Sequence, residues 1–144
     1  MLDQCAFQLE RADAVVRGFE HVVAAADIGD VAVGVTGGDV ALQAFETPGH
    51  TMGHSSFIIK SGNASLFLTG DTVHHNILLE NPKMEVGFDT DSKMGVDTRV
   101  KMLDMLASNR LDTLIYHMAW PGIGNIVKTA SGFRFIARPQ QVVL

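Results

Sequence analysis

Apolar residues recur along the chain with two different spacings, which predict helices in some segments and strands in others. Near the start they return at alternating steps of four and three residues, the spacing of one helix face. These residues are Cys5, Leu9, Ala12, Val16, Phe19 and Val23. We therefore expect a helix over residues 3–26 with Asp3 at its N-terminal cap, and the following "DIGD" ends the pattern.

A second segment with helical spacing lies in the C-terminal half of the chain. It predicts a helix over residues 92–109, with Asp91 as its N-terminal cap. The apolar stripe that faces the core is expected to consist of Val96, Val100, Leu103 and Ala107. The segment "NPKMEVGFDTD" before this helix has no period of either kind and is expected to be irregular.

The remaining apolar segments are short, and their composition predicts strands. "TGG" and "SGN" separate two pairs of them as hairpin turns would, and residues 122–139 predict a closing hairpin. In "ASLFLTGD" the apolar run Leu66, Phe67 and Leu68 is typical of a strand buried on both faces. The other strand segments are "VAVGV", "DVALQAFE", "SSFIIK" and "LDTLIYH". The pattern favours one α/β domain over residues 1–144, with a mixed sheet covered by helices.

Composition narrows the class of protein without defining its chemistry. Apolar residues make up 47% and charged residues 19% of the 144, a globular composition. The net charge of −5 argues against a nucleic-acid or anionic-membrane surface. No apolar run approaches a membrane span or a signal peptide, so we expect a cytoplasmic location. Cys5 is the single cysteine, which excludes an internal disulfide, and we expect it to be a small buried side chain.

Three predicted strands are followed closely by a residue that can bind a metal. His50 follows the "TPG" corner after one strand, Asp71 ends "LFLTGD", and His117 ends "TLIYH". Proline fixes one backbone angle and glycine permits unusual ones, so the corner can direct an imidazole from the strand end. Any one of these residues alone would more often be structural. Together they predict a site along one edge of the sheet.

The quoted motifs resemble the C-terminal half of the metallo-β-lactamase superfamily. "TPGHTMGHSS", "LFLTGD" and a later strand-end histidine carry the general likeness. "GDTVHH", "FDTDSK", "TRVKMLD", "YHMAWPGIGNIV" and "GFRFIARP" resemble the branch that contains methyl parathion hydrolase and related esterases and lactonases. The resemblance covers about residues 25–139. It implies half of an αββα sandwich whose complete form holds two metal ions, usually zinc, at one edge of the paired sheets.

The resemblance also implies roles for individual residues. His50 would bind one metal and His117 the other, while Asp71 would bridge both and take a direct part in catalysis. A metal-bound hydroxide would then attack an ester, lactone or phosphotriester in a small-molecule substrate. His54 would brace the site without binding a metal, although direct binding is a minority alternative.

Two further residues are candidates for substrate contact. His74 and His75 are neighbours that should point apart, so they cannot both face one metal. Either one of them lines the cleft, for which we take His75, or neither does. Trp120 is expected to supply apolar cleft wall, and otherwise it is core.

The other ligands of the family come from an HxHxDH motif, and no such string precedes His50. Each metal would keep one histidine and a share of Asp71, too few protein ligands for a tight site. Three interpretations follow: a portion of a longer hydrolase that is inactive alone, a short chain that forms a homodimer or pairs with a complementary N-terminal half, or a non-catalytic dimerising module derived from the same fold.

Overall fold

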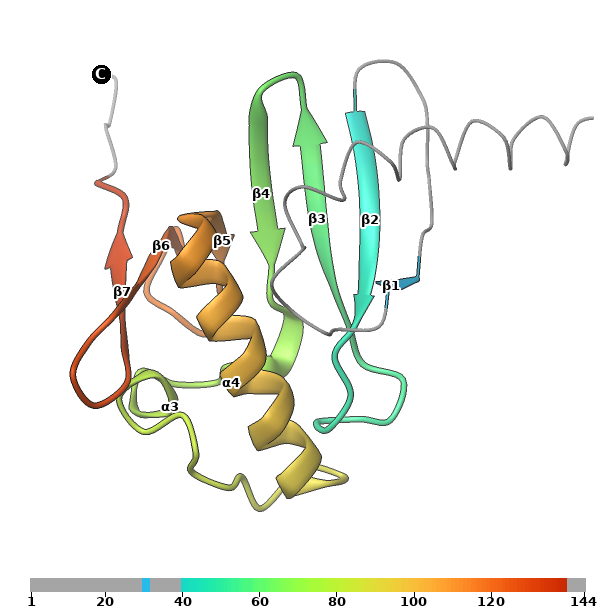
Figure 1. The fold of residues 1–144 in the computed structure, drawn as a ribbon, viewed down its shortest axis with the longest axis vertical. Coiled ribbons are helices and arrows are strands. Elements are labelled where there is room, and N and C mark those ends of the chain that lie inside the picture. Colours follow the sequence, from blue (N-terminus) through green and yellow to red (C-terminus); the bar gives the residue numbers. More distant parts are fainter. Residues whose placement is uncertain (1–29, 32–39, 140–144) are drawn as a thin grey trace, which may run out of the picture.

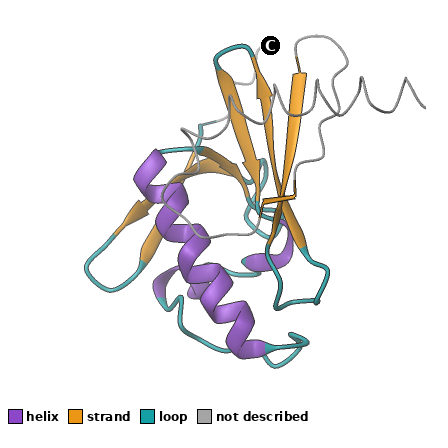
Figure 2. Cartoon of the chain, turned by 45° about the vertical axis from the view of Figure 1, so that its right-hand side comes forward, coloured by secondary structure: helices purple, strands orange, loops and turns teal. Residues whose placement is uncertain are grey.

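The computed structural model describes residues 30–31 and 40–139, which form one mixed sheet with a long helix lying across it (Figures 1 and 2). The strands are β1 (Asp30–Val31), β2 (Val40–Glu46), β3 (Ser55–Ser61), β4 (Ala64–Leu68), β5 (Asp112–Leu114), β6 (Ile123–Lys128) and β7 (Phe133–Ala137). The helices are the 3₁₀ turn η1 (Gly70–Thr72), the short α3 (Ile77–Glu80) and α4 (Ser92–Asn109). The predicted helix over residues 3–26, Cys5 and the predicted "TGG" turn lie outside the described residues.

The sheet keeps the strands in chain order, from β1 to β7. Every neighbouring pair is antiparallel except β4 and β5, which are parallel. The predicted hairpin at "SGN" is confirmed, with Gly62 at a φ of 54° that glycine adopts without steric cost. The closing hairpin is confirmed as β6 and β7, which pair from Gly124 with Ala137 to Lys128 with Phe133.

Strand direction brings three chain segments to one edge of the sheet. β2 and β4 are each antiparallel to β3, so they run the same way, and β5 is parallel to β4. The C-terminal ends of β2, β4 and β5 therefore lie at the same edge, the lower one in Figure 1. The segment between β4 and β5 includes α4 and makes the long crossover that a parallel pair requires.

The core lies between this sheet and α4. Phe45, Ile58 and Phe67 from three adjacent strands are each no more than 1% exposed, and the rings of Phe45 and Phe67 are 5.7 Å apart. Leu103 and Leu106 of α4 belong to the same apolar cluster. In β2 the face toward α4 is that of Ala41 and Phe45, which includes the buried Gln43, and not the face of Val40, Leu42 and Ala44.

The bounds of α4 agree with the prediction, but its buried face does not. The Asp91 side chain accepts a hydrogen bond from the Met94 amide at 2.9 Å, which confirms it as the N-terminal cap. The buried residues are Gly95, Arg99, Met102, Leu103, Met105 and Leu106. Of the predicted stripe only Leu103 is fully buried, and Val96, Val100 and Ala107 are half-buried. The helix is turned so that Arg99 faces inward, where its guanidinium group contacts backbone carbonyls and a carboxylate.

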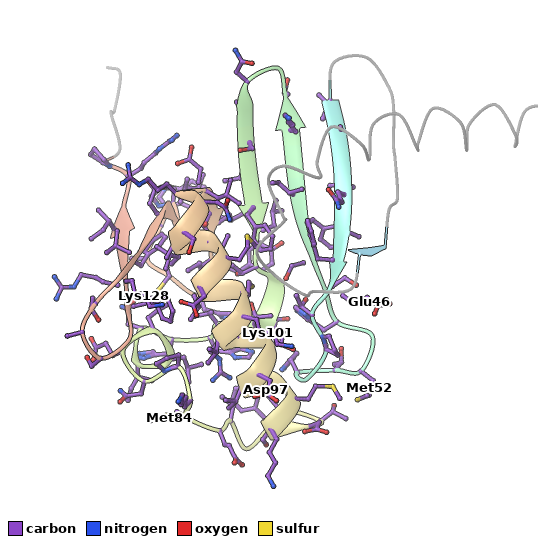
Figure 3. All side chains as sticks on the ribbon, viewed as in Figure 1. Glu46, Met52, Met84, Asp97, Lys101 and Lys128 are labelled. Atoms are coloured by element: carbon purple, nitrogen blue, oxygen red, sulfur yellow. The ribbon has the colours of Figure 1, made fainter. Side chains whose placement is uncertain are left out.

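The outer face of α4 is polar. Asp97 and Lys101 are exposed on it (Figure 3), and Asp104 forms an ion pair of 2.6 Å with Lys128 of β6. Among the helices of the described segments, none is long and apolar enough to cross a membrane.

Candidate metal centre

The three predicted metal ligands all lie on segments that leave the shared edge of the sheet. His50 lies in the loop between β2 and β3, and Asp71 lies in η1 directly after β4. β5 is shorter than predicted and ends at Leu114, so His117 lies three residues beyond the strand rather than at its end. Ile115 still contacts the start of β6 through a hydrogen bond from its amide to the Gly122 carbonyl (2.9 Å), and the chain turns directly after it, where the Met118 amide donates to the Ile115 carbonyl (3.2 Å).

The Pro48-Gly49 corner is fixed against the start of α4. Gly49 has a φ of 136°, and a Cβ placed on it would be 2.3 Å from the Gly95 Cα. The Thr98 hydroxyl donates to the Pro48 carbonyl at 2.7 Å, and the Asp91 amide donates to the Gly49 carbonyl at 3.0 Å. The corner can therefore approach the helix only because Gly49 lacks a side chain. This contact sets the position from which His50 projects.

A buried carboxylate orients the His50 ring. Asp89 Oδ1 lies 3.1 Å from His50 Nδ1, and the Asp89 side chain is only 2% exposed. An aspartate that holds one imidazole nitrogen leaves the other, Nε2, as the nitrogen that can bind a metal. Asp89 stands 39 residues after His50 in the sequence, within the motif "FDTDSK".

Arg99 supports Asp89 from inside the core. Its side chain is 1% exposed, and Nη2 lies 3.8 Å from the other carboxylate oxygen of Asp89. Nε donates to the Thr72 carbonyl at 3.0 Å, and Nη1 donates to the carbonyls of Pro82 (3.1 Å) and Met84 (2.7 Å). The guanidinium thus joins α4, the turn after β4 and the irregular segment before α4. This network explains why α4 is turned from the predicted orientation.

Asp71 and His117 are in direct contact. His117 Nε2 lies 2.9 Å from Asp71 Oδ1, and both side chains are 43% exposed. The hydrogen bond with His117 is the main reason why the pKa of the Asp71 carboxyl lies below its usual value. An ionised carboxylate beside an imidazole is a pair of groups that a divalent cation can bind together.

His54 has both ring nitrogens occupied by the protein. The Asp71 amide donates to His54 Nε2 at 2.8 Å, so Nε2 carries no proton. Nδ1 must then carry the proton, and it lies 3.0 Å from the Thr47 carbonyl and 2.8 Å from the Thr47 hydroxyl. Gly70 makes this approach possible, because a Cβ there would be 2.6 Å from His54 Nε2. The ring is thus arranged to hold the Asp71 backbone, with no nitrogen left for a metal.

The hydrogen bond between His54 and the Thr47 hydroxyl continues into the core through a second hydroxyl, that of Ser56. The Thr47 hydroxyl lies 3.0 Å from the Ser56 hydroxyl, which donates to the Thr69 carbonyl at 2.9 Å. Thr47, Ser56 and Thr69 are each no more than 1% exposed. Because buried polar groups are stable only when they are paired, this chain of hydroxyls fixes the ends of β2 and β4 relative to each other.

His74 lies at the centre of the group, although no specific role was predicted for it. Its ring centroid is 4.9 Å from that of His50 and 5.2 Å from that of His117. Both ring nitrogens are buried, and neither has a hydrogen-bond partner among the described residues. The ligand atoms of Asp71, His74 and His117 all lie within 4.8 Å of one another. These three residues have the donor types and spacing of a metal site.

The two predicted substrate residues lie outside this group. His75 is exposed, and its Nδ1 accepts a hydrogen bond from the Ile77 amide at 3.2 Å. The prediction that His74 and His75 point apart is consistent with this, but His74 is the one directed into the cluster. Trp120 is 84% exposed in the loop between β5 and β6. Substrate contact by either residue stays a prediction. The rings of Phe88 and His74 pack nearly perpendicular to each other, with centroids 4.9 Å apart.

The environment of His54 predicts that the metal-free chain loses stability in mild acid. Burial is the largest cause that lowers the pKa of His54 below 6.5, so the unfolded chain takes up its proton first. The contribution of the neutral His54 ring to the free energy of unfolding is therefore fully present above pH 6.5. It decreases as the pH is lowered toward the folded-state pKa. Urea unfolding in EDTA from pH 7.5 to 5 should show a smaller pH dependence for His54→Gln than for the unsubstituted chain.

His75→Gln is the matched control, because it removes an exposed imidazole from the same region. Its unfolding free energy should follow that of the unsubstituted chain across the pH range. Identical pH dependence in the His54→Gln variant and the unsubstituted chain would contradict the assignment of the neutral ring.

Three solved structures that resemble the chain are described as a lactonase and two hydrolases. AidC, described as a dizinc quorum-quenching lactonase in complex with a product, is 32% identical with a TM-score of 0.67, over 69% of this chain and 34% of its own. The hydrolase AbOPH of the beta lactamase superfamily is 28% identical with a TM-score of 0.66, over 69% and 35%. No protein-family model matches the chain, and no curated protein matches it.

A third structure extends the likeness in fold. A probable metal-dependent hydrolase from Staphylococcus aureus is 17% identical with a TM-score of 0.54, over 75% of this chain and 38% of its own. The chain thus spans about a third of the length of these proteins. Its mixed sheet with α4 and the His/Asp cluster at one edge agrees with part of their fold. The chain therefore carries part of the fold of the metallo-β-lactamase superfamily hydrolases, and it resembles the lactonase-like members of that superfamily.

Proposed function

We propose that this chain supplies part of the active site of a metal-dependent hydrolase that cleaves an ester, a lactone or a phosphotriester. The observation that carries the proposal is the gathering of Asp71, His74 and His117, with His50 beside them, at one edge of the sheet. The dizinc lactonase and the beta lactamase superfamily hydrolase with related folds support the same reaction class. No serine or cysteine nucleophile is needed for it.

The residues present suit zinc. His74 offers two buried ring nitrogens without a partner among the described residues, and His50 keeps Nε2 available while Asp89 holds Nδ1. In a complete site His50 and His117 would each bind one ion, and Asp71 would bind both. Bound zinc would supply a water with a pKa of about 7 and would polarise the substrate oxygen. Asp89 and His54 act by position, since one orients His50 and the other holds the Asp71 backbone.

The proposed two-ion site needs ligands that this sequence does not contain. The chain has no HxHxDH string before His50, and it spans about a third of the length of the hydrolases it resembles. We propose that the active form includes a complementary segment or partner that carries those ligands. A small-molecule substrate and a soluble assembly fit this function.

The test is complementation. The purified chain is mixed with a separately expressed segment that carries an HxHxDH motif, and zinc is added. Hydrolysis of an aryl ester, an acyl-homoserine lactone and a dialkyl aryl phosphate is then measured. We expect hydrolysis in the mixture and not in either part, and we expect EDTA or Asp71→Asn to abolish it.

Control measurements separate a failed assembly from a wrong function. Native mass spectrometry reports whether the complex forms and how many zinc ions it holds. A folded complex with two zinc ions and no hydrolysis above that of free zinc would refute the proposal. A metal-free, stable homo-oligomer of the chain alone would instead favour the non-catalytic dimerising module.

A further inference from the structure

Among the histidines that the structure describes, His74 is the one whose two ring nitrogens are buried without a hydrogen-bond partner. A buried polar group without a partner destabilises the fold, because it has lost its hydrogen bonds to water. Each of the other nearby histidines has a protein partner: His54 uses both nitrogens, His75 accepts from an amide, and His50 is held by Asp89. Among these described histidines, His74 is therefore the ring whose nitrogens remain open to an added ligand.

The surroundings of His74 identify that partner as a cation. Its ligand atom lies within 4.8 Å of those of Asp71 and His117, and the latter two are already 2.9 Å apart. Ligand atoms around a tetrahedral zinc ion are separated by roughly 3.4 Å, given bonds of about 2.0–2.2 Å. Small side-chain rotations would therefore bring all three to one ion. Two imidazoles and one carboxylate are a common zinc ligand set that leaves a fourth position open.

We propose that Asp71, His74 and His117 bind one zinc ion in this chain on its own. This goes beyond the proposed function, because it makes His74 a direct zinc ligand and requires no complementary segment. It also differs from the two-ion arrangement, in which His50 and His117 are the histidine ligands from this part of the fold. His50 is not a member of the three-residue group and is not needed for the single ion.

The experiment measures zinc rather than activity. The tag-free chain is stripped with EDTA, reloaded with zinc, desalted and analysed for bound metal, and its affinity is determined against a chelating indicator. We expect one ion per chain. His74→Phe keeps an aromatic ring of similar size without nitrogens. It should weaken binding by about 100-fold or more, because even residues that only support a ligand are worth 10–100-fold in affinity.

Matched variants make the result specific. His75→Phe makes the same change one residue away, and His50→Phe removes the neighbouring ring that the two-ion arrangement would require. Both should bind zinc within a few-fold of the unsubstituted chain. Circular dichroism of the metal-free proteins verifies folding, and His74→Asn replaces His74→Phe if the larger ring is not accommodated.

Three outcomes would overturn the inference: no zinc retained by the unsubstituted chain, unchanged affinity in the folded His74 variants, or affinity lost in His50→Phe instead of His74→Phe. The result is independent of the complementation test. A chain that binds one zinc ion through His74 but never gains hydrolysis would refute the proposed function alone.

Discussion

Replacing Arg99 by methionine is expected to destabilise the chain by about 3–5 kcal/mol, because the substitution leaves Asp89 as a buried carboxylate without its cation. The carbonyls of Thr72, Pro82 and Met84 would also lose their donor. Thermal unfolding should show a midpoint lower by roughly 10 °C or more. Chemical denaturation of the same variant provides the free energy.

Two comparisons test whether the loss arises from this buried network. Arg134→Met makes the same chemical change at an exposed position of β7 and should alter stability by less than about 0.5 kcal/mol. Asp89→Asn removes the carboxylate charge, so the double variant with Arg99→Met should lose less than the sum of the single losses. Additive losses would mean that Arg99 and Asp89 do not interact across their 3.8 Å separation.

Gly49→Ala is expected to cost roughly 3 kcal/mol, through backbone strain and a steric clash together. The φ of 136° is one that L side chains rarely adopt, and the new Cβ would lie 2.3 Å from the Gly95 Cα. The neighbour is helix backbone, which cannot move aside as a flexible side chain would. Urea unfolding measures the cost directly.

Gly53→Ala is the control within the same loop. A Cβ at Gly53 would meet nothing within 4 Å, so stability should change by no more than about 0.5 kcal/mol. An equal effect at the two positions would show that the loop merely tolerates alanine poorly. That result would contradict the conclusion that contact with α4 fixes the corner before His50.

Local sequence signals predicted the elements well where the deciding contacts are also local. The Asp91 cap and the bounds of α4 depend on residues within one turn, and the "SGN" turn joins strands that are adjacent in sequence. The sequence also predicted that the C-terminal ends of β2, β4 and β5 lie at one edge of the sheet. The reason is that each of these strands is followed closely by a residue that can bind a metal. The helix predicted at residues 3–26 lies outside the described residues.

The errors occur where partners are far apart in the chain. The predicted apolar stripe of α4 does not include Arg99, because arginine is normally exposed and because helical spacing does not reveal its partners Thr72 and Asp89. For His74 and His75, spacing shows that the rings point apart but not which of them faces the site. The Asp89 contact joins residues 39 positions apart, and only the folded chain reveals it.

The parallel pairing of β4 with β5 has a consequence for the kinetics of folding. Asp71 and His117 are 46 residues apart and meet only after the crossover through α4 has closed. Contacts between residues so far apart in sequence form slowly. The chain between them loses conformational entropy before the new contacts contribute any stabilisation. Cation capture at this edge is therefore expected to be a late event, and a zinc-sensitive probe would report completion of the crossover rather than the initial collapse of the hairpins.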